Sequence, residues 1–370
     1  MIRPQKDERR TCRGGYHPPL HTSEKENAMI RFECDYTTGA HPKILEALVE
    51  TNTEACPGYG VDGHCEHARA MLQELCQAPE AGVHFLMGGT QANTTIIAAA
   101  LRPHQGVLCA STGHINVHET GAIEATGHKV LVLPAAGGKI TAQQIDAYCQ
   151  THFDDPAWEH MVQPGMVYLS FPTEWGTVYT LSELEEITQT ARRWKLPLFV
   201  DGARLACGLA SSDVTLPDLA RLCDVFYLGG TKAGLLFGEA VVITNPALNK
   251  DFRYLIKQHG GMLAKGRLLG VQFEAFLSNE LFLEIGKKEV AQAMRLRDAF
   301  QTKGWSLLVN SASNQQFPIL PNEVLPVLEQ NFSFEVWEKV DTSHTAVRFC
   351  TSWSTTDADV DTLIAAIQPL

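Results

Sequence analysis

Two stretches of the sequence decide the fold: residues 197–204 read Pro-Leu-Phe-Val-Asp-Gly-Ala-Arg, and residues 225–232 read Val-Phe-Tyr-Leu-Gly-Gly-Thr-Lys. Each begins with a short apolar run typical of a buried strand and continues into glycine and a charged side chain, Asp201 or Lys232. In an open parallel sheet, ligands bind beyond the carboxyl ends of the strands. The pattern therefore predicts an α/β sheet with Asp201 and Lys232 at one rim.

Short apolar runs alternate with helix-length amphipathic runs from about residue 43 to residue 305, which is typical of βα units. We expect one doubly wound, mostly parallel sheet of seven strands with helices on both faces. The expected strands are Val83–Met87, Gly106–Ala110, Lys129–Leu133, Met166–Phe171, Pro197–Asp201, Asp224–Gly229 and Glu239–Thr244, and the clearest helices are Gln91–Leu101, Leu181–Lys195 and Glu289–Lys303.

The sequence also predicts how the chain divides. Residues 1–28 carry basic side chains without apolar periodicity and are expected to form a disordered extension. A segment over 29–60 should pack with a small domain, and 61–305 should form the large α/β domain. Shorter strands at Phe317–Leu320 and Ala346–Cys350 predict that 306–370 forms the small α+β domain.

Composition limits the function. The net charge of -12 and the pI near 5.6 disfavour general binding to nucleic acid or to an anionic membrane. No apolar run of membrane-spanning length and no secretory leader is visible, so we expect a cytoplasmic protein that acts on a small molecule. The ten cysteines lack the paired spacings of zinc sites and are expected to be reduced thiols, mostly buried.

A third strand end, Gly88-Gly89-Thr90, follows Val-His-Phe-Leu-Met at 83–87. Two glycines and a threonine at the start of a helix offer free backbone N–H groups that can hold a phosphate. The same residues would also suit a plain strand-to-helix turn in which Thr90 caps the helix.

Asp201 and Lys232 together suggest a specific cofactor. A buried carboxylate at Asp201 would be stabilised by a pyridinium nitrogen, although an ion pair with Arg204 is an alternative. A desolvated Lys232 amine could form an imine with an aldehyde, although a lysine that binds phosphate is an alternative. The three strand ends in this order predict pyridoxal 5'-phosphate; a phosphate-binding protein without covalent chemistry is the alternative outside the enzymes.

Over Met29–Leu370 the chain resembles the β-eliminating lyase and threonine aldolase family of fold-type-I pyridoxal-phosphate enzymes, and within it the low-specificity L-threonine aldolases. The resemblance rests on motifs in order: Glu-Cys-Asp-Tyr at 33–36, Gly-Tyr-Gly-Val-Asp at 58–62, Gly-Gly-Thr-Gln-Ala-Asn at 88–93, Gly-His-Ile at 113–115 with Glu119, Asp-Gly-Ala-Arg at 201–204, Gly-Gly-Thr-Lys at 229–232, Lys257, Leu-Ala-Lys-Gly at 263–266 and Val-Arg-Phe-Cys-Thr at 347–351.

The resemblance implies a role for each matching position. The implied cofactor contacts are His114 stacked on the ring, Gly89 and Thr90 on the phosphate, Asp201 on the pyridine nitrogen, Arg204 beside the ring, Lys232 on the aldehyde carbon and Lys265 on the phosphate of a neighbouring subunit. The implied substrate contacts are Cys34, Tyr59, Arg204 and Arg348, with both arginines on the carboxylate. It also implies a homodimer or homotetramer with sites at the subunit interface, to which 29–60 contributes.

Three positions depart from the family pattern. Cys34 replaces the usual serine, which puts one hydroxyl contact to the substrate carboxylate in doubt. Thr231 stands before the lysine where the aldolases commonly have serine, and it keeps a hydroxyl. The segment Phe171–Thr177 differs from the Asn-Thr-His pattern of better-known aldolases at a place where a side chain could face the substrate hydroxyl.

The implied reaction is cleavage of the Cα–Cβ bond of a β-hydroxy-α-amino acid, with L-threonine or L-allo-threonine giving glycine and acetaldehyde. His114 or His118 could take the hydroxyl proton. Two alternatives remain among the enzymes: a β-eliminating lyase acting on cysteine, serine or an aromatic amino acid, and an aminotransferase. His64, Cys65 and His67 lie close in sequence, but their offsets do not fit a tetrahedral site, and we expect no metal.

Overall fold

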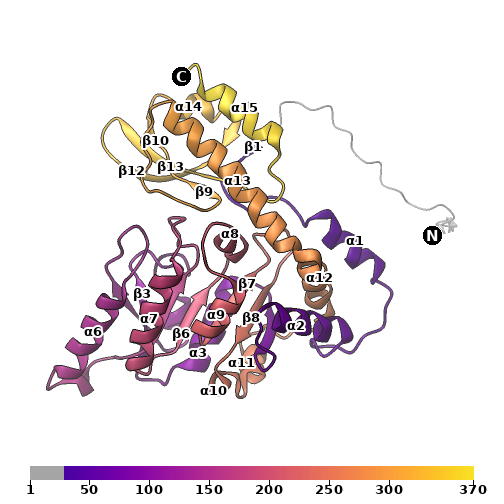
Figure 1. The fold of residues 1–370 in the computed structure, drawn as a ribbon, viewed down its shortest axis with the longest axis vertical. Helices are drawn as coiled ribbons and strands as arrows, with labels where there is room; N and C mark the ends of the chain where they lie inside the picture. Colours follow the sequence, from indigo (N-terminus) through magenta and orange to yellow (C-terminus); the bar gives the residue numbers. More distant parts are fainter. Residues whose placement is uncertain (1–28) are drawn as a thin grey trace, which may run out of the picture.

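The computed structural model describes residues 29–370 as a large α/β part with a smaller part stacked on it (Figure 1). The large sheet has the strand order β2-β8-β7-β6-β5-β3-β4. Its strands are β2 (Gly82–Leu86), β3 (Gln105–Ala110), β4 (Lys129–Leu133), β5 (Gln163–Ser170), β6 (Leu198–Asp201), β7 (Val225–Gly229) and β8 (Glu239–Ile243). The seven strands expected from the sequence are thus confirmed, within a few residues at each end.

Only β8 runs against the other strands of this sheet, because it pairs antiparallel with both β2 and β7 while the remaining pairs are parallel. The carboxyl ends of β2, β3, β5, β6 and β7 therefore share one edge. Since β8 is reversed, its first residue, Glu239, lies at that same edge.

Alternate residues of the strands face two separate apolar layers. On β5, Val167 and Leu169 contribute to one core cluster, and Met166 and Tyr168 contribute to the other. Burial on both faces explains why the strands read as continuous apolar runs. The α3 and α11 side chains lie in the layer with Tyr168, and the α2, α6, α7, α9 and α12 side chains lie in the layer with Val167.

The helices are α1 (Pro42–Glu50), α2 (Gly63–Leu75), α3 (Gly89–Ala100), α4 (His114–Val117), α5 (Ala122–Ala125), α6 (Ala142–Asp154), α7 (Leu181–Arg193), α8 (Leu205–Ala210), α9 (Leu216–Leu222), α10 (Pro246–Asn249), α11 (Phe252–Gln258), α12 (Arg267–Leu277), α13 (Leu281–Thr302), α14 (Leu325–Leu328) and α15 (Asp357–Ile367). The expected helices match α3, α7 and the second half of α13. The first half of α13 was not predicted, because the polar side chains at 287–289 interrupt the pattern of apolar residues in the sequence.

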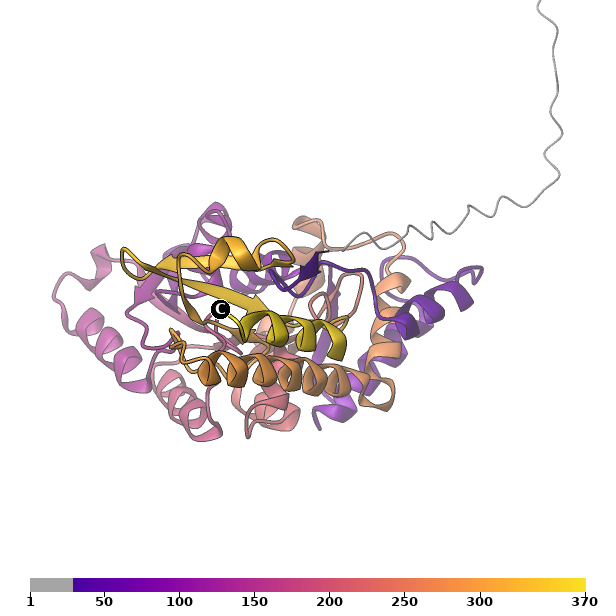
Figure 2. The same cartoon turned by 90° about the horizontal axis from the view of Figure 1, so that it is seen from above.

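The smaller part is built on a sheet in which β13 (His344–Cys350) pairs antiparallel with β10 (Ile319–Pro321), β12 (Glu335–Lys339) and β9 (Gln315–Gln316). α13 and α15 pack beside each other over it, as Figure 2 shows from above. Along α13, Ile285 belongs to the core of the large part, and Phe300 belongs to the core of the smaller part. One rigid helix therefore ties the two parts together.

The first described residues of the N-terminal segment join the smaller part. β1 (Ile30–Arg31) pairs with β11 (Phe332–Ser333), and Phe32 is fully buried in the same core. The expected extension over 1–28 lies outside the described residues. Expected strand Phe317–Leu320 was wrong in its bounds, because two short strands flank Phe317 and Pro318, and proline cannot donate to a ladder. β12 was not predicted, because it is a charged and mostly exposed strand without a run of apolar residues.

Candidate active site

The three predicted strand ends meet at one cavity. Gly88, Gly89 and Thr90 after β2, Asp201 at the end of β6 and Lys232 after β7 all line a hollow of about 290 Å³. They lie at the shared carboxyl edge of the large sheet, where ligands of open α/β sheets bind.

Asp201 is a buried carboxylate surrounded by donors. The hydroxyls of Tyr227 and Tyr168 donate to its two oxygens at 2.5 and 2.6 Å, the amide of Asn93 donates at 3.0 Å, and the backbone N–H of Ala203 donates at 3.0 Å. Burial alone would raise the pKa of Asp201, but the electrostatic interaction with His114 and these side-chain donors outweigh it and hold the pKa below its usual value. Asp201 is therefore a fixed anion at the floor of the cavity.

A hydrogen-bonded chain connects Asp201 to His114. Asn93 also donates to Glu119 at 2.7 Å, and the same Glu119 oxygen contacts His114 Nδ1 at 2.7 Å. Glu119 thereby fixes the orientation of the His114 ring. The sequence marked Glu119 only as part of a motif and gave Asn93 no role. The amide of Asn93 is needed because it donates to two carboxylates at once.

Lys232 reaches the cavity from the turn after β7. Burial lowers the pKa of Lys232, and the positive charge of Arg204 lowers it further. Among the described residues, no hydrogen bond or ion pair engages its Nζ atom. Thr231 donates instead to Glu239 at 2.8 Å, where burial raises the pKa of Glu239 to about 8. A desolvated, unengaged amine is the state that favours a lysine nucleophile.

The start of α3 is open toward the cavity. Gly88 is the residue before the helix and makes no side-chain capping bond, so Thr90 does not cap the helix as a plain turn would require. A Cβ atom on Gly89 would lie 3.1 Å from the Tyr227 hydroxyl, which explains the need for glycine there. The first backbone N–H groups of α3 are left to a ligand.

Arg348 lines a second cavity, of about 300 Å³, between the two parts of the molecule. Its guanidinium donates to the Gln315 side chain and to the Glu33 carbonyl, both at 3.0 Å, pairs with Glu335, and lies over the Trp337 ring at 5.4 Å. Arg348 is thus a buried cation that faces the cavity, and its acidic partner is Glu335.

Arg204 lines both cavities but is already paired. Its Nε and one Nη atom contact the two oxygens of the buried Asp35 at 2.5 and 3.1 Å, and no ion pair links it to Asp201. A bidentate pair of this kind occupies most of the guanidinium fork. Arg204 and Arg348 are both predicted to bind a substrate carboxylate. The partner of Arg348, Glu335, is partly exposed and can be displaced more easily than Asp35, the buried partner of Arg204.

Three predicted residues do not line either cavity within one chain. Cys34 is half-buried beside them, although its neighbour Tyr36 lines both. Tyr59 and Lys265 lie near each other outside these two cavities. The Tyr59 N–H donates to the carbonyl of Ala264, the residue before Lys265, at 3.2 Å, and the Lys257 Nζ atom lies 5.0 Å from the centre of the Tyr59 ring. Their predicted roles would need the site of another subunit.

The sequence overlooked Glu174, which lines both cavities. It lies in the segment Phe171–Thr177, just after β5, where the sequence departs from the family pattern. That departure was the available signal.

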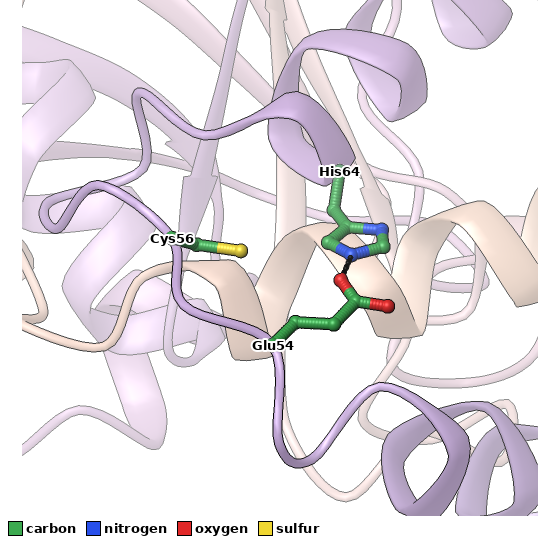
Figure 3. Close-up of side chains that lie close together, drawn as sticks. All are labelled: Glu54, Cys56 and His64. Atoms are coloured by element: carbon green, nitrogen blue, oxygen red, sulfur yellow. Dashed lines mark hydrogen bonds and ion pairs between the residues drawn. The ribbon is translucent and has the colours of Figure 1, made fainter.

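The grouping of His64, Cys65 and His67 is not formed, because Cys65 is buried against the Gly266 carbonyl. Figure 3 shows His64 beside Glu54 and Cys56 instead. Both ring nitrogens of His64 already contact carboxylates, Glu54 at 2.8 Å and Glu274 at 2.5 Å. The geometry suits an imidazolium held between two acids, and the hydrogen bond that His64 donates to Glu54 leads the contributions that raise the pKa of His64.

Nine cysteines of the described part are free thiols, and seven of them are buried, as expected. Within residues 29–370, no helix has both the length and the apolar character needed to cross a bilayer.

A doubly wound sheet with a lysine and an aspartate at neighbouring strand ends defines the fold-type-I architecture, a class of pyridoxal-phosphate-dependent enzymes. A family profile described as beta-eliminating lyase matches residues 32–317, and the chain belongs to that family. The chain is similar to a solved threonine aldolase from Leishmania major, with 44% identity, a TM-score of 0.89, and coverage of 92% of this chain and 99% of that one.

Two curated relatives agree with this assignment. A low specificity L-threonine aldolase from Pseudomonas aeruginosa is 33% identical over 68% of this chain and 73% of its own length. Another from a Pseudomonas species is 28% identical over 91% of this chain and 97% of its own length. An alanine–glyoxylate aminotransferase from Nostoc, with 16% identity and a TM-score of 0.70, shares the fold.

Proposed function

We propose that the protein uses pyridoxal 5'-phosphate to cleave the Cα–Cβ bond of β-hydroxy-α-amino acids, converting L-threonine or L-allo-threonine to glycine and acetaldehyde. The observation that carries this proposal is the single cavity lined by Gly89, Thr90, Asp201 and Lys232, with Arg348 facing the adjoining one. Membership in the beta-eliminating lyase family and similarity to threonine aldolases support the choice of reaction.

Three features of the cavity fit this cofactor. The open start of α3 suits a phosphate, the fixed anion at Asp201 suits a protonated ring nitrogen, and the desolvated amine of Lys232 suits a covalent bond to the aldehyde carbon. His114, whose ring is oriented by Glu119, would cover the cofactor ring. When bound, pyridoxal phosphate accepts the electron pair released at the substrate Cα.

The residues of the chain then position the substrate. The planar guanidinium of Arg348 would bind the substrate carboxylate through two hydrogen bonds. The substrate carboxylate would then replace the Glu335 side chain, which pairs with Arg348 in the structure. With the carboxylate at Arg348 and the amino group at Lys232, the Cα substituents are fixed in direction, so that one bond is chosen for cleavage. Arg204, held by Asp35, would form the wall beside the substrate.

A homodimer or homotetramer is part of the proposal, with Tyr59 and Lys265 reaching the cavity of a neighbouring subunit. Neither residue lines the cavity of its own chain, which supports this assignment. Tyr59 is about half exposed in one chain, as a residue awaiting a partner surface would be. Mixing inactive Lys232→Ala subunits with inactive Tyr59→Ala subunits should restore activity, because some mixed sites would contain both intact residues.

Product analysis tests the reaction. The purified enzyme should be incubated separately with L-threonine, L-allo-threonine, phenylserine, L-serine and L-cysteine. We expect glycine and an aldehyde from the β-hydroxy amino acids. Ammonia with pyruvate would instead establish a β-eliminating lyase, and a keto acid formed only with an amino acceptor would establish an aminotransferase.

A further inference from the structure

Glu174 is a buried carboxylate that lacks half of its expected partners. Its side chain is 9% exposed. Oε1 accepts hydrogen bonds from the backbone N–H of His114 at 2.7 Å and from the Ser170 hydroxyl at 2.5 Å. Within the described residues, the buried Oε2 atom has no hydrogen-bond partner. An unsatisfied buried carboxylate oxygen is unfavourable, so a ligand that donates a hydrogen bond to this carboxylate would be stabilised there.

The position of Glu174 suits such a ligand. Five residues line both cavities: Tyr36, His114, Glu174, Arg204 and Lys232. A substrate with its amino group at Lys232 and its carboxylate at Arg348 would pass through this shared region. The side chain on its Cα would therefore lie among these five residues.

Most of the other shared residues are engaged. The His114 Nδ1 atom is bonded to Glu119, Arg204 is paired with Asp35, and Lys232 is assigned to the cofactor. Tyr36 is more than half exposed and is a poor base in its neutral form. Glu174 thus lines the shared region with a carboxylate group, one oxygen of which has no hydrogen-bond partner among the described residues.

Resting on the proposed function, we propose that Glu174 is the catalytic residue that accepts the proton of the substrate β-hydroxyl on its carboxylate. The O–H bond breaks, and its electron pair becomes the second bond of the aldehyde C=O. The Cα–Cβ bond breaks, and its electron pair passes to Cα. One proton then returns to Cα, so threonine gives glycine and acetaldehyde without any oxidant or reductant.

The surroundings of Glu174 suit this role. Burial raises the pKa of Glu174, and the negative charge of Asp201 adds to that effect, against the hydrogen bonds from Ser170 and His114. A carboxylate with a raised pKa is a stronger base. The titratable groups that face it or share its cavities are Tyr36, Cys109, His114, His118, Tyr168, Tyr179, Asp201, Arg204, Tyr227, Lys232, Glu239, Glu335 and Arg348.

His118 is the competing base and provides the matched control. It lines only the Arg348 cavity, and burial, followed by the charge of His114, lowers the pKa of His118. Its ring lies 5.6 Å from that of His114. If His118 took the proton, loss of Glu174 would leave cleavage intact.

The experiment compares two reactions of the same holoenzyme. One is cleavage of L-threonine or phenylserine, and the other is exchange of the glycine Cα proton in D₂O, which requires the cofactor and Lys232 but no hydroxyl. Glu174→Gln keeps the size of the side chain and an acceptor for Ser170 and His114. We expect it to lower kcat for cleavage by about 10²-fold or more and to change glycine exchange by less than threefold. His118→Gln should keep cleavage within about tenfold of the parent.

The outcomes are distinct. Cleavage by Glu174→Gln within threefold of the parent, or equal losses in both reactions, would overturn the role of Glu174. A parent enzyme that exchanges glycine but never cleaves a β-hydroxy amino acid would overturn the proposed function itself. Glu174→Asp changes the same position but retains a carboxylate. It should therefore cleave faster than Glu174→Gln if the carboxylate is needed for the reaction and not only for folding.

A measurement independent of turnover follows from the raised pKa. A carboxyl whose folded-state pKa lies above its unfolded value contributes stability that is lost as the pH rises through the folded value. The melting temperature of the parent holoenzyme should therefore fall relative to Glu174→Gln between pH 5 and pH 8. A constant difference across that range would contradict the buried, titrating carboxyl on which the proposal depends.

Discussion

The two walls of the active cavity are built differently. On the wall formed by the large sheet, Asp201 is buried and receives four hydrogen bonds from groups that are themselves fixed by packing. On the wall formed by the smaller part, Arg348 is held by Glu335, whose side chain is 45% exposed. On the sheet wall, the hydrogen bonds that hold Asp201 are formed before any ligand binds. On the other wall, the contact between Arg348 and Glu335 is one that a ligand carboxylate can replace.

This difference matches the two kinds of ligand. A cofactor that stays bound is best served by rigid, preorganised groups, because no reorganisation is then needed during the reaction. A substrate that enters and leaves in each cycle needs a cation whose local partner can be displaced. Glu335 keeps Arg348 paired between cycles, and because the Glu335 side chain is 45% exposed, water can solvate it when the substrate carboxylate takes its place.

The largest effect is expected from Lys232→Ala on the sheet wall. The variant should lose the borohydride-sensitive absorbance of the bound cofactor and all measurable cleavage, because no other amine lines the cavity in the described part of the chain. Circular dichroism should remain that of the parent. The exposed Lys250→Ala serves as the control, and an adduct retained on a different lysine would show that the assignment is wrong.

Asp201→Asn should have the next largest effect. The amide cannot act as an anion beneath the ring, so we expect kcat to fall by about 10²-fold or more, with a smaller change in cofactor affinity. Steady-state kinetics and cofactor titration measure the two effects separately. Turnover equal to that of the parent would assign Asp201 a purely structural role.

Arg348→Lys probes the exchangeable wall. Lysine keeps the charge but offers one point contact instead of a fork, so we expect KM to rise about tenfold and kcat to fall as well. The cofactor spectrum should be unchanged, which separates this wall from the first. Kinetic constants within twofold of the parent in both Arg348→Lys and Arg348→Ala would exclude a role in carboxylate binding.

Glu335→Gln should act in the opposite direction and more weakly. Removing the competing carboxylate should lower KM for the amino acid by up to about fivefold, with little change in kcat. Competitive inhibition by a simple carboxylate should strengthen in parallel. A raised KM would mean that Glu335 positions Arg348 and does not compete with the substrate.

The smallest effect is expected at His64, which belongs to neither wall. Its pKa is raised above 6.5 by Glu54 and Glu274, so its charged form contributes stability that is present below that value and is lost as the pH rises through the higher folded value. The melting temperature of His64→Gln should be below that of the parent at pH 6 and should approach it above pH 8. Activity should not change, and His67→Gln, which loses one contact with Glu274, is the matched control.

Much of the fold was legible in the sequence because parallel strands buried on both faces read as continuous apolar runs. All seven strands of the large sheet were found in this way. β12 and the first half of α13 were not, because their polar side chains hide the periodicity on which such predictions depend. Short edge strands such as β1 depend on pairing with distant segments and leave almost no local signal.

The sequence by itself determined the sheet, the three strand ends that meet at its edge, and the residue types that suit a pyridine ring, an aldehyde and a phosphate. Only the tertiary structure decided the partners: Arg204 pairs with Asp35, Arg348 pairs with Glu335, and Asn93 links Asp201 to Glu119. Within residues 29–370, one oxygen of Glu174 has no hydrogen-bond partner. The physical reason is the separation along the chain of the residues that interact. Burial patterns repeat along the chain, whereas these contacts join residues tens to hundreds of positions apart, mostly on different elements.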